Sequence, residues 1–163
     1  MTSAVEIPAE LLEDGRAAPM VRRQVATQAT LDRFRGKLFS WSGGKTCLHL
    51  MHAHLRHCGM RVPPLPTVRS ALGARRALDK RGCANMAEVI DGLELERLPA
   101  PAMMTIGDLA YRSSADGFGA VLVCVGANQL LGWVDAVTTA EEDEGEPVPN
   151  CEVFIMALDQ VEA

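Results

Sequence analysis

The chain has 163 residues, of which 48% are hydrophobic and 23% are charged. This length suits one domain with short extensions, and this composition excludes disordered and collagen-like chains. No uncharged apolar run approaches the roughly 18 residues of a spanning helix, and the first residues lack a basic start followed by an apolar stretch. We therefore expect neither a membrane span nor signal-peptide secretion.

The net charge of −5 conceals two oppositely charged parts. Residues 16–81 hold 14 Lys and Arg against two acids, whereas residues 82–163 hold two basic residues against 15 acids. Either the two parts neutralise each other within the fold, or each faces a different partner. We do not expect nucleic acid as a partner, because the basic residues are not interleaved with aromatics and no helix-turn-helix or zinc-finger pattern occurs.

The five cysteines are an odd number and include no C-x-x-C motif. Their spacings fit neither a zinc site nor a disulfide framework. We expect reduced thiols in a protein made in a cytoplasm, most of them buried as small apolar side chains.

In chain order, the sequence predicts an N-terminal arm over residues 1–18, which a series of helices follows. Apolar spacing predicts a helix over residues 20–34. A tight turn, S-G-G-K, then precedes a helix from Cys47 to about residue 58, for which Thr46 is the expected N-cap. After a proline-rich connector, further helices are expected over residues 68–80 and, from a capping box, 85–93.

Beyond Pro101 the pattern changes to strands. They are expected over residues 107–111, 120–125, 129–134 and 152–158, with an acidic loop at 138–150. Helices followed by a strand meander predict an α+β fold, in which N-terminal helices pack on a small antiparallel sheet. Residues 19–163 form a single domain in this interpretation.

The G-G-K-T-C turn allows two kinds of chemistry. Gly44, Lys45 and Thr46 resemble the end of a phosphate-binding loop, but Phe39 stands where that motif needs a further glycine. Alternatively, Cys47 is a nucleophile, since the free N–H groups and dipole of a helix start favour a thiolate and can form an oxyanion hole. The simpler alternative is a helix-start cysteine that packs in the core, because such a cysteine without a base is inert in acyl transfer.

The order of these motifs resembles the NlpC-type cysteine peptidases, papain-like enzymes that cut peptidoglycan stem peptides. The segment F-S-W-S-G-G-K-T-C at residues 39–47 resembles the family's approach to its nucleophile, with Thr46 in place of Asp. Residues 106–109 resemble its Gly-Asp-Leu strand start, and residues 120–133 resemble its next two strands. The resemblance covers residues 31–135 and is closest to small proteins of tail-module clusters in tailed phages and gene transfer agents.

The catalytic histidine of that family is missing here. The matching positions are Gly119 and Ala120, and no histidine follows residue 57. All four histidines lie on the helix that Cys47 starts, where His49 and His52 point to other sides. His54 returns to the side of Cys47, but roughly 10 Å further along the axis. Since a general base must approach to about 3 Å, helix geometry excludes a Cys–His dyad within this helix. Asp116 could approach from a loop, but a carboxylate raises a thiol pKa.

Two spacings on this helix could suit a metal ion, His54 with Cys58 and His54 with His57, each needing a third ligand from elsewhere. Surface or core-edge histidines are commoner, so we predict neither a metal nor a cofactor. The resemblance then implies a pseudoenzyme: a structural component of a phage-like tail tip or baseplate, located in the virion and made in the host bacterial cytoplasm. Its expected partners are other tail proteins and peptidoglycan. Two alternatives stay open, an active peptidoglycan peptidase or amidase with Cys47 as nucleophile, and a cytoplasmic tail-assembly factor.

Overall fold

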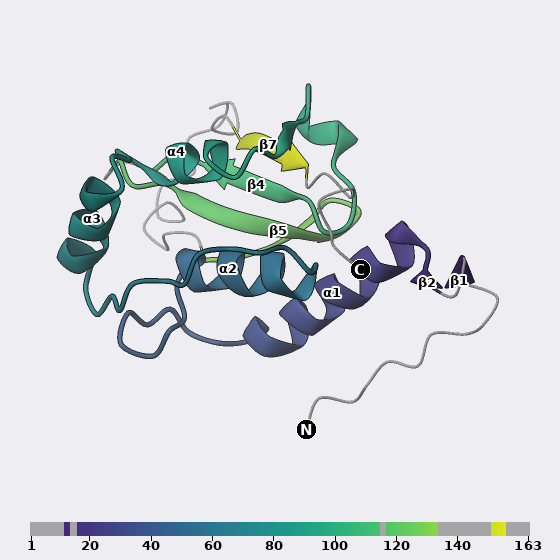
Figure 1. Ribbon diagram of the computed structural model, residues 1–163, viewed down its shortest axis with the longest axis horizontal. Coiled ribbons are helices and arrows are strands. Elements are labelled where there is room, and N and C mark those ends of the chain that lie inside the picture. Colours follow the sequence, from purple (N-terminus) through teal and green to yellow (C-terminus); the bar gives the residue numbers. More distant parts are fainter. Residues whose placement is uncertain (1–11, 14–15, 115–116, 134–150, 156–163) are drawn as a thin grey trace, which may run out of the picture.

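The computed structural model describes residues 12–13, 16–114, 117–133 and 151–155. It shows helices packed on an antiparallel sheet, which confirms the predicted α+β class (Figure 1). The expected acidic loop at 138–150 and the end of the last predicted strand lie outside the described residues. So does most of the predicted arm; its described part is a short hairpin of β1 (Leu12–Glu13) and β2 (Arg16–Ala17).

The helical part follows the predicted order. The helices are α1 (Pro19–Phe34), α2 (Cys47–His57), α3 (Ala71–Lys80) and α4 (Met86–Asp91). Thr46 is the N-cap of α2 as predicted. Helix α3 begins three residues later than expected, because the Ser70 side chain accepts a hydrogen bond from the Gly73 N–H at 3.1 Å and caps the helix there. Helix α4 ends at Asp91 rather than residue 93, with Gly92 as its C-cap.

The sheet has five antiparallel strands in the order β3-β7-β4-β5-β6. Strands β4 (Leu109–Arg112), β5 (Ala120–Gly126) and β6 (Gln129–Leu131) form the predicted meander. The last strand, β7 (Cys151–Ile155), departs from it, because it pairs with β4 and not with β6. The prediction missed β3 (Glu96–Arg97), a two-residue edge strand that pairs with β7. The 3-10 helix η2 (Pro101–Met103) precedes β4.

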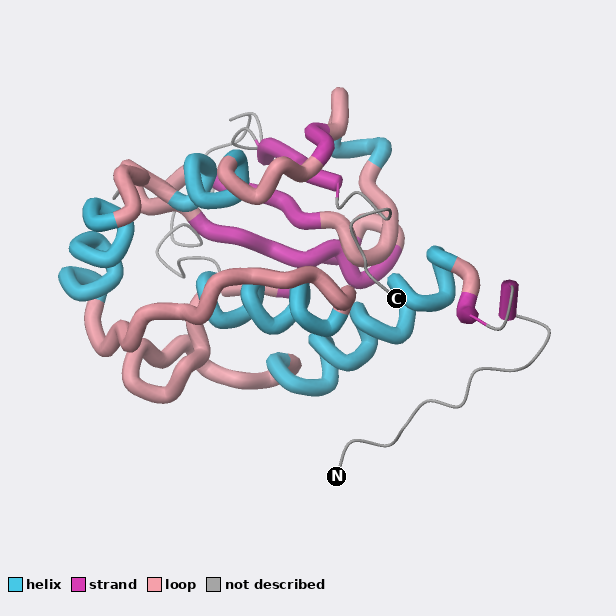
Figure 2. The backbone as a smooth tube through the Cα atoms, in the orientation of Figure 1, coloured by secondary structure: helices cyan, strands magenta, loops and turns pink. Residues whose placement is uncertain are grey.

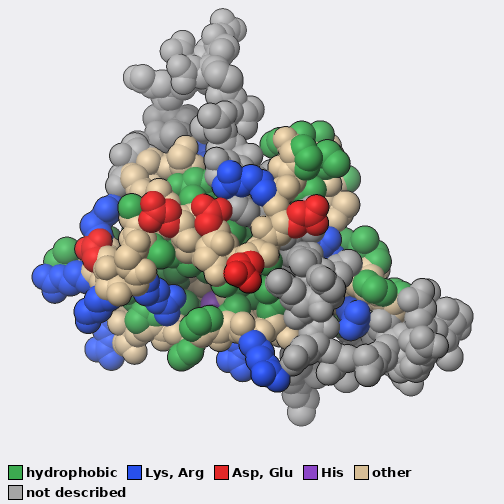
Figure 3. Space-filling model, turned by 45° about the horizontal axis from the view of Figure 1, so that its top comes forward, with side chains coloured by type: hydrophobic (Ala, Val, Ile, Leu, Met, Phe, Trp, Pro, Cys, Tyr) green, Lys and Arg blue, Asp and Glu red, His purple; other side chains and the backbone are tan. Residues whose placement is uncertain are grey.

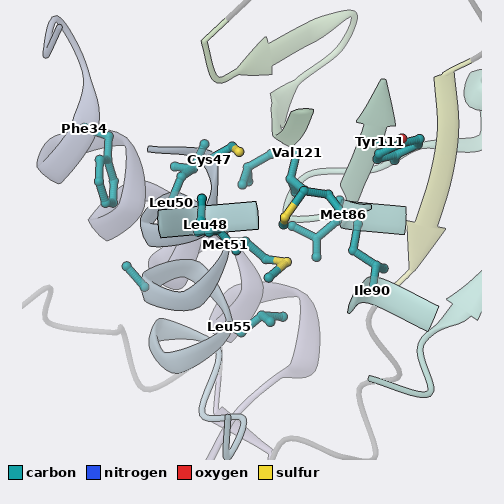
Figure 4. Close-up of a cluster of buried hydrophobic side chains, with 14 of the residues drawn as sticks. Phe34, Cys47, Leu48, Leu50, Met51, Leu55, Met86, Ile90, Tyr111 and Val121 are labelled. Carbon is teal, nitrogen blue, oxygen red and sulfur yellow. The ribbon is translucent and has the colours of Figure 1, made fainter. Parts of the chain in front are cut away.

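The main core lies between the sheet and the helix pair α1–α2. Helix α2 packs directly on β5, and α1 packs against α2 (Figure 1). Figure 4 shows apolar side chains of α2 in one cluster with Val121 of β5 and with Met86 and Ile90 of α4. Figure 2 shows the connector after α2 running back beside that helix, where the His52 Nε2–H donates to the Pro63 carbonyl at 3.0 Å.

Candidate functional site

The turn before α2 is closed by its own backbone. Ser40 and Lys45 form an isolated antiparallel bridge, with N–H···O distances of 2.9 and 3.0 Å in the two directions. The Gly43 N–H donates to the Ser40 hydroxyl at 3.0 Å. These amides therefore have protein partners, whereas a phosphate-binding loop directs its N–H groups at the ligand.

Cys47 is the first residue of α2, as the sequence predicts, and its side chain is only 7% exposed. It belongs to the hydrophobic core cluster, and Figure 4 shows its sulfur directed toward Val121 of strand β5. Cys47 therefore lies at a helix start that packs against the sheet. Its burial also fits a core residue.

The four histidines of α2 each bind a group other than Cys47. The His49 Nδ1 lies 2.8 Å from the Thr46 hydroxyl, and His52 donates to the connector. His54 and His57 both approach Thr30 of α1. Burial lowers the pKa of His49, and the charges of Arg33 and His52 lower it further. In the described residues, the imidazoles of α2 therefore form hydrogen bonds to the N-cap Thr46, to the connector and to Thr30 of α1.

Gly119, one of the two positions at which the resemblance places the peptidase histidine, has no space for a side chain. Its backbone φ is +80°, and a Cβ there would lie 2.2 Å from Cε2 and 2.4 Å from the hydroxyl of Tyr111. The Tyr111 ring, from β4, is buried and fills this space. The other matching position, Ala120, begins β5 opposite Arg112. A histidine at residue 119 would need the tyrosine ring to move and the backbone to accept a strained φ.

The Gly-Asp-Leu motif forms a buried polar contact with α1 that the sequence analysis missed. Asp108 and Arg23 form a buried ion pair. The other Asp108 oxygen accepts the Thr105 N–H at 2.6 Å, and Arg23 also donates to the Thr105 hydroxyl at 3.2 Å. Gly107, with a φ of +88°, lets α1 approach, because a Cβ there would lie 2.8 Å from Arg23 Cγ. The motif thus fastens the helix layer to the sheet.

A sequence signal for Arg23 existed. It lies on the same stripe of α1 as Ala26, Thr27, Thr30 and Phe34, and all of these residues are buried. An arginine on the apolar stripe of a helix needs a buried partner, because an unpaired buried charge is costly. The spacing alone could therefore have predicted a buried carboxylate opposite α1, although not which one.

His54 is fully buried and bonded through both ring nitrogens. Its Nε2 lies 2.9 Å from the Gly107 carbonyl, and its Nδ1 lies 3.0 Å from the Thr30 hydroxyl. Burial lowers the pKa of His54 from 6.5 to about 4, and the nearby charges of His57 and Arg23 act in the same direction. The neutral ring carries its proton on Nε2, since a carbonyl only accepts, and its Nδ1 faces the Thr30 hydroxyl, which also donates to the Ala26 carbonyl at 3.0 Å.

This proton arrangement also leaves no free nitrogen on His54 for a metal ion. Cys58, whose Sγ lies 3.7 Å from His54 Nε2, keeps its proton because burial raises the pKa of its thiol to about 12. No group of three or more potential ligand side chains comes together in the part of the chain that the structure describes. The buried polar cluster of Thr30, His54 and His57 is therefore a contact between α1, α2 and the Gly107 turn.

These features define the class of the domain: an α+β domain with a helix-start cysteine packed on an antiparallel sheet. The chain belongs to the family described as a domain of unknown function, DUF6950, whose model matches residues 20–142. No curated protein and no solved structure matches the chain. No helix in the described ranges has both the length and the apolar character needed to cross a membrane.

Proposed function

We propose that the chain is a non-catalytic papain-like domain of the NlpC type, which serves as a structural component of the tail tip or baseplate of a phage-like particle. The observation that carries the non-catalytic part is Gly119, where the Tyr111 ring occupies the space that a side chain would need. The family's base cannot stand there while Tyr111 keeps its place. A helix-start cysteine and a buried Gly-Asp-Leu contact then serve the fold rather than hydrolysis.

The hydrogen bonds that the histidines form with other residues support the same proposal. Acyl transfer by a cysteine needs a base within hydrogen-bond reach that removes the thiol proton. His54 uses both nitrogens for Thr30 and Gly107, and His49 bonds to the Thr46 hydroxyl. Tail proteins would then bind the outer surfaces of this domain, and the particle would use it as a building unit.

Peptidoglycan digestion tests the non-catalytic part. The purified full chain is incubated with peptidoglycan, and released fragments are identified by mass spectrometry beside the Cys47→Ala variant. We expect no fragments from either protein. The matched control is Cys58→Ala, another buried cysteine of the α2 region, with circular dichroism to show that each variant is folded. Fragments from the wild type and Cys58→Ala, but not from Cys47→Ala, would show an active peptidase and overturn the proposal.

Particle composition tests the structural part. We expect the chain in the proteome of purified particles, and we expect Cys47→Ala to leave the number of tailed particles in electron micrographs unchanged. If the chain is needed for tails but is absent from finished particles, it is an assembly factor and the structural proposal is wrong. Loss of tails with a folded Cys47→Ala chain would also contradict it.

A further inference from the structure

At one end of the molecule the basic residues outnumber the acidic ones among the described residues, where Asp32 of α1 and Asp79 of α3 are the flanking acids. Between residues 33 and 78 the sequence has nine Lys and Arg and no Asp or Glu. None of the nine side chains is buried. The C-terminal end of α1, the turn before α2 and the helix α3 lie at the same end of the molecule in Figure 1. In Figure 3, Lys and Arg side chains gather at that end, while acidic side chains lie mainly over another part of the visible face.

An apolar protrusion stands in this cationic end. Leu38 is 85% exposed and Phe39 is 44% exposed, although both are large apolar side chains. The Phe39 ring is fixed between two tryptophans, with centroid distances of 5.1 Å to Trp41 and 6.0 Å to Trp133. The Trp133 Nε1–H also donates to the Lys37 carbonyl at 2.9 Å. We call Lys37, Leu38, Phe39, Trp41 and Trp133 the aromatic turn.

Ring contacts join the aromatic turn to the cations of α3. Trp41 lies edge-on to Phe118 with a centroid distance of 6.3 Å, and the Arg75 guanidinium lies 6.0 Å from the same Phe118 ring. On the α1 side, the Arg33 guanidinium lies 5.2 Å over the Phe34 ring, which also contacts Trp133. The buried rings of Phe118 and Phe34 therefore each contact one tryptophan of the aromatic turn and one arginine.

The cations nearest the protrusion are available to a partner. Arg33, Arg35 and Lys37 are exposed, and they form no ion pair with a carboxylate in the described residues. Seven of the nine cations are arginines, whose planar forks bind carboxylates with two parallel hydrogen bonds. Exposed aromatic and leucine side chains surrounded by arginines resemble the centre and rim of a protein interface.

We propose that the aromatic turn and the cations nearest to it, Arg33, Arg35 and Lys37, dock a carboxylate-rich protein segment that carries apolar side chains, supplied by a neighbouring protein of the particle. These cations hold the carboxylates, and Leu38 and Phe39 pack on the apolar residues of the segment. Duplex nucleic acid would use the cations alone, because its phosphate backbone offers nothing for an exposed leucine. This inference rests on the proposed function only in placing the partner within the particle.

Peptide binding to the full chain tests the docking surface. The probe is a fluorescent peptide with the sequence of residues 134–150, which combines six acidic residues with three valines and has no basic residue. We expect binding that weakens as the salt concentration rises. The double variant Arg35→Glu/Lys37→Glu should weaken it about tenfold or more, and Leu38→Ser about threefold or more. The same peptide with amides in place of all acids should not bind.

Two matched variants control for general effects. Arg97→Glu reverses one positive charge on the exposed edge strand β3, outside residues 33–78, and Met103→Ser removes a 54% exposed side chain from η2, which lies beside β7. Both should bind the peptide as the wild type does. Absent binding by the folded wild type, or equal loss in the controls, would overturn the docking surface. Tighter binding to a DNA duplex, or to vesicles with 30% phosphatidylglycerol, than to the peptide would assign the surface to another class of partner. Either result would overturn the proposal of a protein segment as the partner. None of these outcomes depends on peptidase activity.

Discussion

The buried histidine of α2 should make the fold sensitive to mild acid. In the folded chain the pKa of His54 is about 4, against an ordinary value of 6.5. Between these two pH values the unfolded chain binds a proton that the folded chain excludes, so acid favours unfolding. One pKa unit corresponds to about 1.4 kcal/mol, and His54 alone should therefore remove roughly 3 kcal/mol of unfolding free energy as the pH falls from about 7 to about 4.

Urea unfolding at pH 7.5, 6.5, 5.5 and 4.5, followed by circular dichroism, measures this effect. The His54→Gln variant keeps an N–H for the Gly107 carbonyl but has no group that titrates in this range. Its free energy of unfolding should be lower than that of the wild type at pH 7.5, by roughly 1–3 kcal/mol for the imperfect replacement of a buried hydrogen-bonded group. The difference should shrink, and then reverse or vanish, at pH 4.5.

The matched control is His52→Gln on the same helix, where the imidazole is only half-buried and bonds to the connector. It should retain most of the pH dependence of the wild type. The low pKa of His49 and His57 adds to the acid sensitivity in the same direction, and that part stays in both variants. If His54→Gln and the wild type lose stability in parallel from pH 7.5 to 4.5, the buried neutral imidazole is not the cause and the reasoning fails.

Three further predictions concern the contact between α1 and the Gly-Asp-Leu turn and the buried thiol of Cys58 at the end of α2. Gly107→Ala should lower the free energy of urea unfolding by about 2–4 kcal/mol, because Gly107 has a positive φ and Arg23 Cγ lies close to the new Cβ. The control Gly36→Ala, at a positive φ with no neighbour within 4 Å, should lower it less. Equal losses in the two variants would contradict this reasoning. Asp108→Asn should cost roughly 3–5 kcal/mol by leaving Arg23 buried without a counter-charge, and a double-mutant cycle with Arg23→Met should show coupling rather than additivity. Cys58 should resist alkylation by iodoacetamide at pH 8 in the folded chain and react in urea, since burial raises the pKa of its thiol to about 12. Peptide mass spectrometry measures the alkylation. Rapid alkylation of Cys58 in the folded chain would refute this prediction.

Local signals in the sequence were sufficient for most of the helices and strands. Thr46 and Asn85 are side-chain caps whose partners lie three residues ahead, so short-range chemistry decided where α2 and α4 begin. The apolar run of β5 is buried from Val121 to Cys124, as an unbroken hydrophobic strand predicts. In contrast, β3 consists of two charged, exposed residues that form a strand only because β7 pairs with them, and no local pattern reports such pairing.

The candidate site was less predictable because its residues are distant in sequence. Cys47 was found from its place at a helix start, which is a local feature. The contact of Arg23 with Asp108 joins residues 85 positions apart, and His54 meets the Gly107 carbonyl across 53 positions. The obstruction of Gly119 by Tyr111 depends on the register of β4 beside the start of β5. Such long-range pairings follow from the assembled fold, not from any single segment.

The Tyr111–Gly119 contact also restricts which sequences this domain can reach by single substitutions. A histidine at residue 119 requires a smaller residue at 111, since the tyrosine ring lies within 2.6 Å of the new Cβ. Reducing Tyr111 first leaves a void in the core, and adding the histidine first forces a clash. Each route passes through a destabilised intermediate, so placing a histidine at residue 119 requires two coordinated changes.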